Sequence, residues 1–272
     1  MPRKKRKRTK AQLADPYDLY QRAVQAPEHE VSFFNRIYKR AHGRSPCVLR
    51  EDFCGTFAVS CQWVASRKDR IALGVDIDLD PLDWGRAHNL SKLKPHQQQR
   101  VQLLQDDVRS VTGPKADIVA AQNFSFWVFK TRDELAAYFD SARQNLAKDG
   151  VFILDMMGGP ESMEEDREDV TEYKEFTYVW DQARFDPITH HCRYLIHFHF
   201  RDGSKLHRCF EYNWRFWTLP EVQEVLQEVG FKRVDIYWEG TDQKTGEGND
   251  VYRVRKHAPN ELAWISYVVA VK

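Results

Sequence analysis

The chain has 272 residues, of which 42% are hydrophobic and 30% are charged, enough apolar mass for a sizeable core and enough charge for a soluble globular surface. No stretch approaches the roughly 20 consecutive apolar residues of a membrane-spanning helix, and the N-terminus carries no apolar signal segment. The five cysteines form no Cys-x-x-Cys pair, which is typical of a reduced, cytoplasmic protein. We therefore expect neither membrane insertion nor secretion.

The formal net charge of +1 conceals an uneven distribution. Residues 1–10 carry seven basic groups and no acid, which leaves 34 basic residues against 40 acids in the rest of the chain. This composition predicts a disordered basic tail over residues 1–14. Two alternatives for the tail are a contact with nucleic-acid phosphates and, in a eukaryote, a nuclear address. The acidic remainder does not indicate a nucleic-acid surface of its own.

After the tail, residues 15–45 are predicted to form an N-terminal helical cover. Apolar side chains recur there at spacings of three and four, with an interruption at Pro27, which predicts two short helices. Short β-rich runs then alternate with amphipathic stretches. Strands are expected near residues 47–51, 71–76, 101–105, 116–122 and 151–155, and helices near residues 56–66, 81–93 and 131–147. This alternation predicts parallel strands joined by right-handed crossover helices.

The alternation stops after Gly158-Gly159-Pro160. Residues 161–175 include eight acids, and we predict an exposed loop or mobile lid there. An inserted antiparallel meander is expected next, with strands near residues 174–183, 190–200 and 205–217. The remaining elements are a helix from Thr218 to Gly230 and strands at residues 231–238 and 263–271.

Together these elements predict the fold class. It is α/β, with a Rossmann-like, seven-stranded and mostly parallel sheet, helices on both faces, and an antiparallel β insertion at about residues 160–217. The domain that holds this sheet is expected to span residues 46–272.

Ligands of a doubly wound sheet bind at the carboxyl ends of the strands. The segments that follow the first four strands are Arg50-Glu51-Asp52-Phe53-Cys54-Gly55-Thr56-Phe57, Gly74-Val75-Asp76-Ile77-Asp78, Gln105-Asp106-Asp107-Val108 and Ala121-Gln122-Asn123-Phe124-Ser125. At these residues the chain resembles the class I S-adenosylmethionine-dependent methyltransferases. More narrowly, it resembles an uncharacterised branch that shares the Arg-Glu-Asp-Phe-Cys-Gly-Thr and Asn-Phe-Ser segments. The resemblance covers roughly residues 45–272 and implies S-adenosylmethionine as the cofactor.

The first of these segments corresponds to the family's cofactor loop. Its motif of an acid, two residues and Cys-Gly-Thr-Gly is matched by Glu51 and Cys54-Gly55-Thr56. Gly55 has no Cβ, so the backbone can turn sharply and approach a ligand, and the helix that follows offers free N–H groups. The family's first and third glycines are replaced by Phe53 and Phe57, which leaves the geometry of the loop open.

Four further cofactor contacts are expected. Asp76 ends the second strand about 20 residues after the glycine turn, where an acid can bind a ribose diol. The resemblance implies that Glu51 lies near the methionine amino group and that Asp107 accepts from the adenine amino group. Ile77 and Val108 are candidates to flank the adenine ring.

Other site candidates have competing interpretations. Asn123 is a catalytic candidate that orients the nucleophile, contacts the methionine part of the cofactor, or ties the strand end to its loop. Asp52 is the second catalytic candidate, as a base or as a helix cap. Arg50 either reaches the cofactor carboxylate or forms a surface salt bridge. Tyr20, in the N-terminal helices, is a candidate lid residue over the cofactor.

The inserted meander is rich in aromatic residues and histidines. One hypothesis is that it roofs the acceptor site and forms an aromatic cage that favours a cationic amine. The candidate acceptor-binding residues are Tyr178, Trp180, His197, His199, Tyr212 and Trp214. One of the histidines is alternatively a general base. The competing hypothesis is that one face packs on the domain and the other mediates a homo-oligomer. No metal site is expected, because the histidines lack further ligands.

The predicted function is methyl transfer from S-adenosylmethionine to a small-molecule acceptor, preferably an amine, by in-line displacement. A protein or RNA methyltransferase is one alternative, and it would explain the basic tail. A non-catalytic partner-binding module is another, favoured if Phe53 and Phe57 block the pocket. No membrane partner is expected. The acceptor, the methylated atom and the catalytic base are not identified by the sequence.

Overall fold

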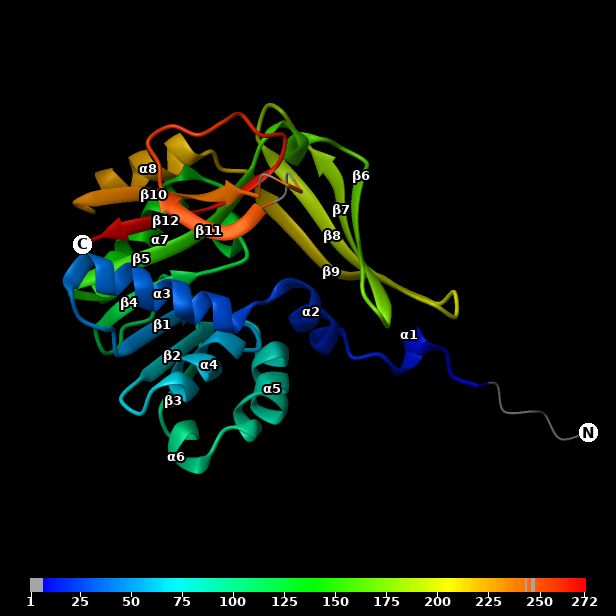
Figure 1. Cartoon of the computed structure of the whole chain (residues 1–272), viewed down its shortest axis with the longest axis horizontal. Helices are drawn as coiled ribbons and strands as arrows, with labels where there is room; N and C mark the ends of the chain where they lie inside the picture. The colour runs from blue at the N-terminus through cyan, green and yellow to red at the C-terminus, as the bar shows by residue number, and fades with distance from the viewer. Residues whose placement is uncertain (1–6, 243, 246–247) are drawn as a thin grey trace, which may run out of the picture. The chain divides into compact units, whose positions relative to one another are not determined.

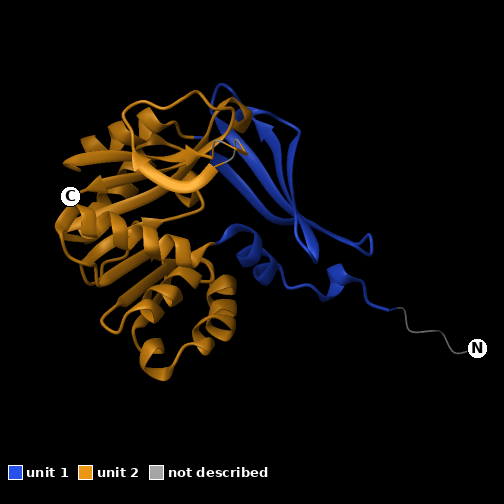
Figure 2. Ribbon diagram, viewed as in Figure 1, with its two compact units in different colours: residues 1–25, 163–216 blue, residues 26–162, 217–272 orange. Residues whose placement is uncertain are grey.

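The computed structural model describes residues 7–242, 244–245 and 248–272. The chain divides into two compact units (Figure 2). The sheet unit comprises residues 26–162 and 217–272, and the meander unit comprises residues 1–25 and 163–216. Among the described residues, no helix combines the length and the apolar character needed to cross a membrane.

The sheet unit is built on an eight-stranded sheet in the order β11-β10-β12-β5-β4-β1-β2-β3 (Figure 1). Its strands are β1 (Val48–Asp52), β2 (Ile71–Asp76), β3 (Val101–Gln105), β4 (Ala116–Ala121), β5 (Leu146–Gly158), β10 (Arg233–Thr241), β11 (Gly248–Val254) and β12 (Trp264–Val271). Strands β1 to β5 pair in parallel. Strand β12 lies antiparallel between β5 and β10. The predicted Rossmann-like, mostly parallel sheet is thus confirmed.

Helices cover both faces of this sheet, as predicted. They are α3 (Pro27–His42), α4 (Ala58–Ser66), α5 (Leu79–His88), α6 (Pro95–Gln98), α7 (Arg132–Asn145) and α8 (Leu219–Glu228), with 3-10 turns at Leu90–Lys92, Ser125–Val128 and Pro160–Met163. On one face, Ile153 of β5 packs in a core with Phe34 of α3 and Trp63 of α4. Its neighbour Phe152 packs on Phe139 of α7. Because successive side chains of a strand point to opposite faces, these contacts place α3 and α7 on opposite faces.

The sheet has one strand more than the seven expected from the sequence. The additional strand is β11, which pairs antiparallel with β10 at the edge of the sheet. Its sequence, Gly-Asn-Asp-Val-Tyr-Arg-Val, is mostly polar and its residues are largely exposed. An edge strand of this kind lacks the apolar run that identifies a buried strand, and its main-chain pairing with β10 defines it.

The meander unit holds a second, antiparallel sheet in the order β6-β7-β8-β9. Its strands are β6 (Arg167–Glu172), β7 (Phe176–Phe185), β8 (His191–Phe200) and β9 (Lys205–Arg215). The expected antiparallel insertion is therefore present. The loop or lid predicted at residues 161–175 is wrong over residues 167–172, which form β6. Charged side chains are tolerated there because β6 is an exposed edge strand that pairs with β7.

The N-terminal segment also differs from the prediction. Helix α1 (Lys10–Leu13) lies within the predicted disordered tail and begins at a capping box formed by Thr9 and Gln12. Two N–H groups of α1 donate to side chains of the loop between β8 and β9, and these contacts order the helix. Residues 1–6 of the predicted tail lie outside the described residues. Within the predicted helical cover, α2 (Pro16–Val24) belongs to the meander unit and α3 to the sheet unit.

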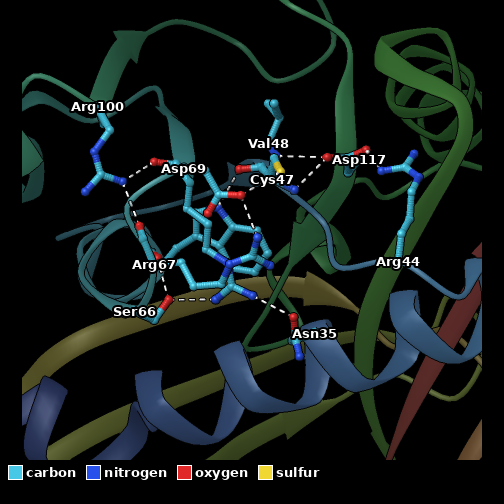
Figure 3. Close-up of polar contacts among 11 residues, drawn as sticks. Asn35, Arg44, Cys47, Val48, Ser66, Arg67, Asp69, Arg100 and Asp117 are labelled. Carbon is cyan, nitrogen blue, oxygen red and sulfur yellow. Dashed lines mark hydrogen bonds and ion pairs between the residues drawn. The ribbon is translucent and has the colours of Figure 1, made fainter.

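A buried carboxylate joins several elements at the amino end of the sheet. Asp117 of β4 accepts hydrogen bonds from the N–H groups of Cys47 (2.7 Å) and Val48 (3.0 Å). It also accepts from the Tyr38 hydroxyl (2.9 Å) and from Arg44 (3.2 Å). Figure 3 shows Asp117 with Arg44, Cys47 and Val48, beside a second set of polar contacts around Asp69 and Arg100. Burial raises the pKa of Asp117, but the hydrogen bonds outweigh it and hold the pKa below its usual value.

Replacing Asp117 by asparagine is expected to lower the free energy of unfolding by about 2–3 kcal/mol at pH 7, because buried donors lose a charged acceptor. The native-state pKa lies below the unfolded-state value, so the carboxylate stabilises the fold above pH 4 and this stabilisation disappears as the pH falls through the native pKa. Urea unfolding at pH 7 and pH 3 measures both effects. An Asp83→Asn variant, at an exposed ion pair, is the control. A loss that is equal at both pH values would contradict the prediction.

Candidate functional site

The loop between β1 and α4 has an unusual backbone. Phe53, Gly55 and Phe57 all have positive φ, at 54°, 51° and 46°. The two phenylalanines therefore adopt the left-handed conformation that glycine favours, at a cost of about 1–2 kcal/mol each. Packing offsets that cost, since Phe57 is fully buried and the Phe53 ring contacts Phe129 and Tyr138 at centroid distances of 6.0 and 5.5 Å. Every second residue from 53 to 57 therefore has positive φ, although only one of the three is a glycine.

The loop lies directly on helix α5. A Cβ atom on Gly85 would come within 2.4 Å of the Phe57 ring and 2.5 Å of the Thr56 carbonyl oxygen. That oxygen also accepts a hydrogen bond of 2.8 Å from Asn89. A Cβ atom on Gly55, in contrast, would meet nothing within 4 Å. One side of the loop is packed tightly, and the other side at Gly55 is open to a ligand.

Cys54 and Thr56 flank this glycine and are both buried. The Cys54 sulfur lies 3.0 Å from the place where a Cβ atom on Gly74 of β2 would stand. Burial raises the pKa of the Cys54 thiol well above its ordinary value, so the thiol stays neutral and packs. The Thr56 hydroxyl is buried without a hydrogen-bond partner among the described residues, and it is available to a ligand.

Asp76 lies at the end of β2, beside the loop. Its carboxylate accepts hydrogen bonds from the N–H of Gly55 (2.7 Å) and the N–H of Asp78 (3.0 Å), one at each oxygen. Burial raises the pKa of Asp76, and the two N–H groups oppose that shift. Each carboxylate oxygen keeps a second lone pair for a ligand hydroxyl. Ile77, the next residue, has a side chain that is 70% exposed.

The acid after β3 is already paired with an arginine. Arg109 donates to both oxygens of Asp107, the shortest contact being 2.6 Å, and this pairing lowers the pKa of Asp107. The Arg109 guanidinium also lies 5.1 Å from the centre of the Phe129 ring. Val108 is buried, and its carbonyl oxygen accepts from Arg50. Of the two residues expected to flank the adenine ring, Ile77 is exposed at the carboxyl end of β2, whereas the Val108 side chain is buried in the core.

Glu51 lies beneath the N-terminus of α4. One of its oxygens accepts from both the N–H (2.8 Å) and the hydroxyl (2.5 Å) of Ser60 in the first turn of that helix. The pKa of Glu51 is raised to about 7, chiefly by burial; the hydrogen bonds from Ser60 oppose the shift, and the carboxylates of Asp76 and Asp52 add to it. Its carboxyl is a buried acid at the carboxyl end of the sheet, where added positive charge would favour its ionised form.

Arg50 and Asp52 point to the other face of the sheet and form a buried ion pair of 2.6 Å. The second Asp52 oxygen accepts from the Tyr138 hydroxyl of α7 at 3.0 Å. Arg50 donates further to the carbonyl oxygens of Val108 and Val111. Neither the expected cofactor contact of Arg50 nor its alternative, a surface salt bridge, fits these contacts. We therefore place Arg50 and Asp52 in the support of the β1 end, and not among ligand-contacting groups.

Asn123 stands at a sharp turn after β4, where it and Phe124 both have positive φ. The N–H groups of these two residues donate to the two oxygens of Asp155, at 2.8 and 3.0 Å. Of the three roles considered for Asn123, these contacts support the link between strand end and loop. Asp155 itself escaped the sequence analysis, although it is an acid near the end of a predicted strand. Burial raises the pKa of Asp155 to about 6.

The aromatic candidates of the insertion belong to the meander unit. Trp180 and Tyr212 have ring centroids 6.1 Å apart, and those of Tyr212 and Trp214 lie 4.4 Å apart. Tyr178 and Tyr20 of α2 join the same apolar cluster. This face of the small sheet therefore packs against α2 and within its own unit. The predicted aromatic cage, and the competing hypothesis of packing on the domain with a homo-oligomer at the other face, both stay predictions. Tyr20 belongs to this cluster and not to the sheet unit.

The histidine candidates also have partners within the meander unit. The Nδ1 atom of His197 accepts from the N–H of Arg208 at 2.8 Å, and its Nε2 atom lies 3.1 Å from an Asp181 oxygen. A neutral His197 that donates through Nε2 satisfies both contacts. Burial lowers the pKa of His199, and the cationic Lys205 lowers it further. In the described part of the chain, no group of three or more His, Cys, Asp and Glu side chains is placed to hold a metal ion.

We compared the chain with known proteins. No protein-family model matches the sequence, and no curated protein matches it. Solved structures do match. A S-adenosylmethionine-dependent methyltransferase from Clostridium acetobutylicum superposes with a TM-score of 0.67 at 16% identity, covering 94% of this chain and 96% of that one.

Two further structures match over nearly their whole length. CalS10, an amino pentose methyltransferase from Micromonospora echinaspora, has a TM-score of 0.66 at 18% identity, covering 95% of this chain and 97% of its own. KedS8, a sugar N-methyltransferase from Streptoalloteichus, has a TM-score of 0.64 at 18% identity, covering 100% and 98%. The chain therefore shares the fold of these proteins, insertion included.

Proposed function

We propose that this chain is an S-adenosylmethionine-dependent methyltransferase that acts on a small-molecule acceptor, with an amine as the acceptor class. The observation that carries this proposal is the loop at the end of β1. Three residues of this loop have positive φ. A Cβ atom on Gly55 would meet nothing within 4 Å, and the Gly55 N–H donates a hydrogen bond to the Asp76 carboxylate. The resemblance of the sequence and the shared fold support the same cofactor.

The residues present fit this cofactor. Asp76 would accept from the ribose hydroxyls, and Ile77 offers an exposed apolar side chain to the adenine. The buried Thr56 hydroxyl has no hydrogen-bond partner among the described residues and would bond to the cofactor. The Glu51 carboxyl would hold the methionine ammonium, which favours the ionised acid. Asp107 would contact the adenine amino group beside its bonds to Arg109.

When bound, the cofactor supplies a methyl group on a positively charged sulfur, and its leaving group departs neutral. The chain's own task is thus to orient the acceptor in line with the methyl group, to exclude water and to keep the nucleophile deprotonated. The acceptor class is supported by the neighbours CalS10 and KedS8, which are described as amino pentose and sugar N-methyltransferases. The alternative of a partner-binding module, with Phe53 and Phe57 blocking the pocket, is tested by cofactor binding itself.

Calorimetric titration with S-adenosylmethionine and S-adenosylhomocysteine tests the proposal without an acceptor. The wild type is expected to bind both saturably. In Gly55→Ala the new methyl group would enter the open space of the loop, so we expect at least tenfold weaker binding. Gly43→Ala is the matched control, since Gly43 also has positive φ and open surroundings but caps α3 at the amino end of the sheet.

The two variants separate strain from ligand contact. Each places alanine in the left-handed region, so both should lose about 1–2 kcal/mol of stability. If Gly55→Ala and Gly43→Ala lost the same cofactor affinity, Gly55 would have no specific role in binding the cofactor. No binding by folded wild-type protein would remove the methyltransferase proposal and favour a partner-binding module.

A further inference from the structure

Polar groups that the proposed cofactor site does not use gather at the carboxyl ends of β4, β5 and β12. Ala121 of β4 pairs with Leu154 of β5, so Gln122 follows beside Asp155. Asp155 in turn pairs with Tyr267 of β12. Gln122 and Asp155 follow Ala120 and Ile153 by two residues, and those two residues belong to the core under α3. Alternation along β5 therefore turns Asp155 to the α3 face, and Gln122 directly follows β4 beside it.

Glu30 reaches the same place from the first turns of α3. Its Oε1 atom accepts a hydrogen bond of 3.0 Å from the Tyr267 hydroxyl. Its Oε2 atom is buried and has no hydrogen-bond partner among the described residues. The pKa of Glu30 is raised to about 8, chiefly by burial and also by the charges of Asp155 and Glu51, while the Tyr267 hydrogen bond opposes the shift. Tyr267 thus links Glu30 to the position of Asp155 on the neighbouring strand, and among the described residues Glu30 forms no ion pair.

Gln122 gives an independent indication that this region binds a ligand. The residue is 8% exposed, and neither its amide oxygen nor its amide nitrogen has a hydrogen-bond partner within the described ranges. A buried amide without partners is destabilising, so proteins retain one where a ligand completes it. The ligand at this place must donate to the Gln122 oxygen and to the carboxyl groups.

The chemistry of these groups selects an organic cation. Carboxyl oxygens and an amide oxygen are acceptors, and an ammonium group supplies up to three N–H donors. The rings of Tyr252 and Tyr267, with centroids 4.8 Å apart, lie next to Glu30 and add aromatic surface of the kind that suits a cation.

We propose that Glu30, Gln122 and Asp155 bind the amino group of the methyl acceptor in its ammonium form, with Tyr267 orienting Glu30. The ammonium passes one proton to the Glu30 carboxylate before methyl transfer, which leaves a neutral amine as the nucleophile. This inference rests on the proposed function and specifies its acceptor site. The position on the sheet distinguishes the acceptor from the cofactor. Strands β2 and β3, which carry the nucleoside-binding acids, lie on one side of β1, whereas β4, β5 and β12 lie on the other. A cofactor with its ribose at β2 and its amino group at Glu51 leaves the β5 and β12 end to the acceptor.

The test uses cyclohexylammonium as the amine probe and cyclohexanol as its uncharged isostere. Both are titrated into full-length protein saturated with S-adenosylhomocysteine. We expect cyclohexylammonium to bind at least tenfold more tightly than cyclohexanol. In Glu30→Gln this preference should disappear, while the affinity for S-adenosylhomocysteine changes less than twofold. Glu28→Gln, at an exposed residue one turn or less away on the same helix, should behave as the wild type.

Calorimetry in two buffers of different ionisation enthalpy gives a second readout. The pKa of Glu30 is about 8, so its carboxyl is mostly protonated at pH 7, and a bound ammonium favours the carboxylate. Binding of one amine to the wild type should therefore release about one proton. No release is expected in Glu30→Gln. The groups whose charge acts on Glu30 are Asp155 and Glu51, and both are unchanged in this variant.

A second variant guards against a purely structural explanation. Gln122→Met removes the unpaired amide, so the ligand-free protein should melt at a higher temperature while binding cyclohexylammonium at least fivefold more weakly. A lower melting temperature with unchanged amine binding would overturn the proposal. The proposal would also be overturned if Glu30→Gln lowered the affinity for S-adenosylhomocysteine as much as the affinity for cyclohexylammonium. Such a result would mean that these acids bind the ammonium group of the cofactor itself. If S-adenosylhomocysteine does not bind the wild type, the proposed function fails, and the amine titration of the free protein still decides whether the ammonium site exists.

Discussion

Replacing Asp52 by alanine is expected to lower the free energy of unfolding by about 3–5 kcal/mol, the loss typical of breaking a buried ion pair. Arg50 is 1% exposed, and its Nε atom is paired with the Asp52 carboxylate at 2.6 Å. Without that carboxylate the guanidinium remains buried with an unbalanced charge, and the Tyr138 hydroxyl loses its acceptor. Chemical denaturation at pH 7 measures the loss.

The Arg50→Met/Asp52→Leu double variant separates the charge effect from packing. It removes both charges and keeps apolar volume, so it should lose less stability than Asp52→Ala alone. Asp69→Ala, at an exposed acid of the same sheet unit, is the single-site control and should be close to the wild type. A loss below about 1 kcal/mol for Asp52→Ala would mean that Asp52 is available for another role, and its catalytic interpretation would return.

Replacing Asp76 by alanine is expected to weaken S-adenosylhomocysteine binding by about 100-fold. Hydrogen bonds to a charged group contribute about 1.5–3 kcal/mol each, so two bonds to a ribose diol amount to at least a factor of 100. The substitution also frees the N–H groups of Gly55 and Asp78, which the carboxylate accepts at 2.7 and 3.0 Å. Calorimetric titration measures the affinity, and urea unfolding reports any loss of loop support.

Two companion variants sharpen this prediction. Asp76→Asn keeps an oxygen that can accept from Gly55 but offers a donor in place of the second oxygen, so its affinity should fall by about tenfold. Asp80→Ala removes an exposed acid in the first turn of α5 and should leave affinity unchanged. If Asp76→Ala binds within about threefold of the wild type, the ribose does not contact this residue.

Several strands and helices could be predicted because each is recognisable from its own short stretch of sequence. Strands β2 and β4 and residues 151–154 of β5 are buried, so each appears in the sequence as a short, mostly apolar run. Helices α7 and α8 begin at capping boxes of Thr131 with Glu134 and of Thr218 with Glu221. A side chain that satisfies the helix end within three residues can be recognised without any tertiary contact.

Strands β6 and β11 were missed for the opposite reason. Both are polar edge strands, and their hydrogen bonds go to β7 and β10. Helix α1 was missed similarly, since it is one turn whose N–H groups donate to Asp202 and Ser204, nearly 200 residues away in the chain. Stability that comes from such distant partners leaves no periodic pattern in the segment itself.

For the site, the sequence by itself determined which residues stand at the carboxyl ends of the strands, because the order of strands and acids is written along the chain. The tertiary structure alone decided what each acid does. Glu51 and Asp52 are neighbours, yet alternation turns Glu51 under α4 and Asp52 towards Arg50 and α7. The hydrogen-bond partners of Asp155 lie in the turn after β4, and the partner of Glu30 is Tyr267 of β12. A carboxylate's role depends on burial and on partners brought together by packing, and neither is encoded by its local sequence.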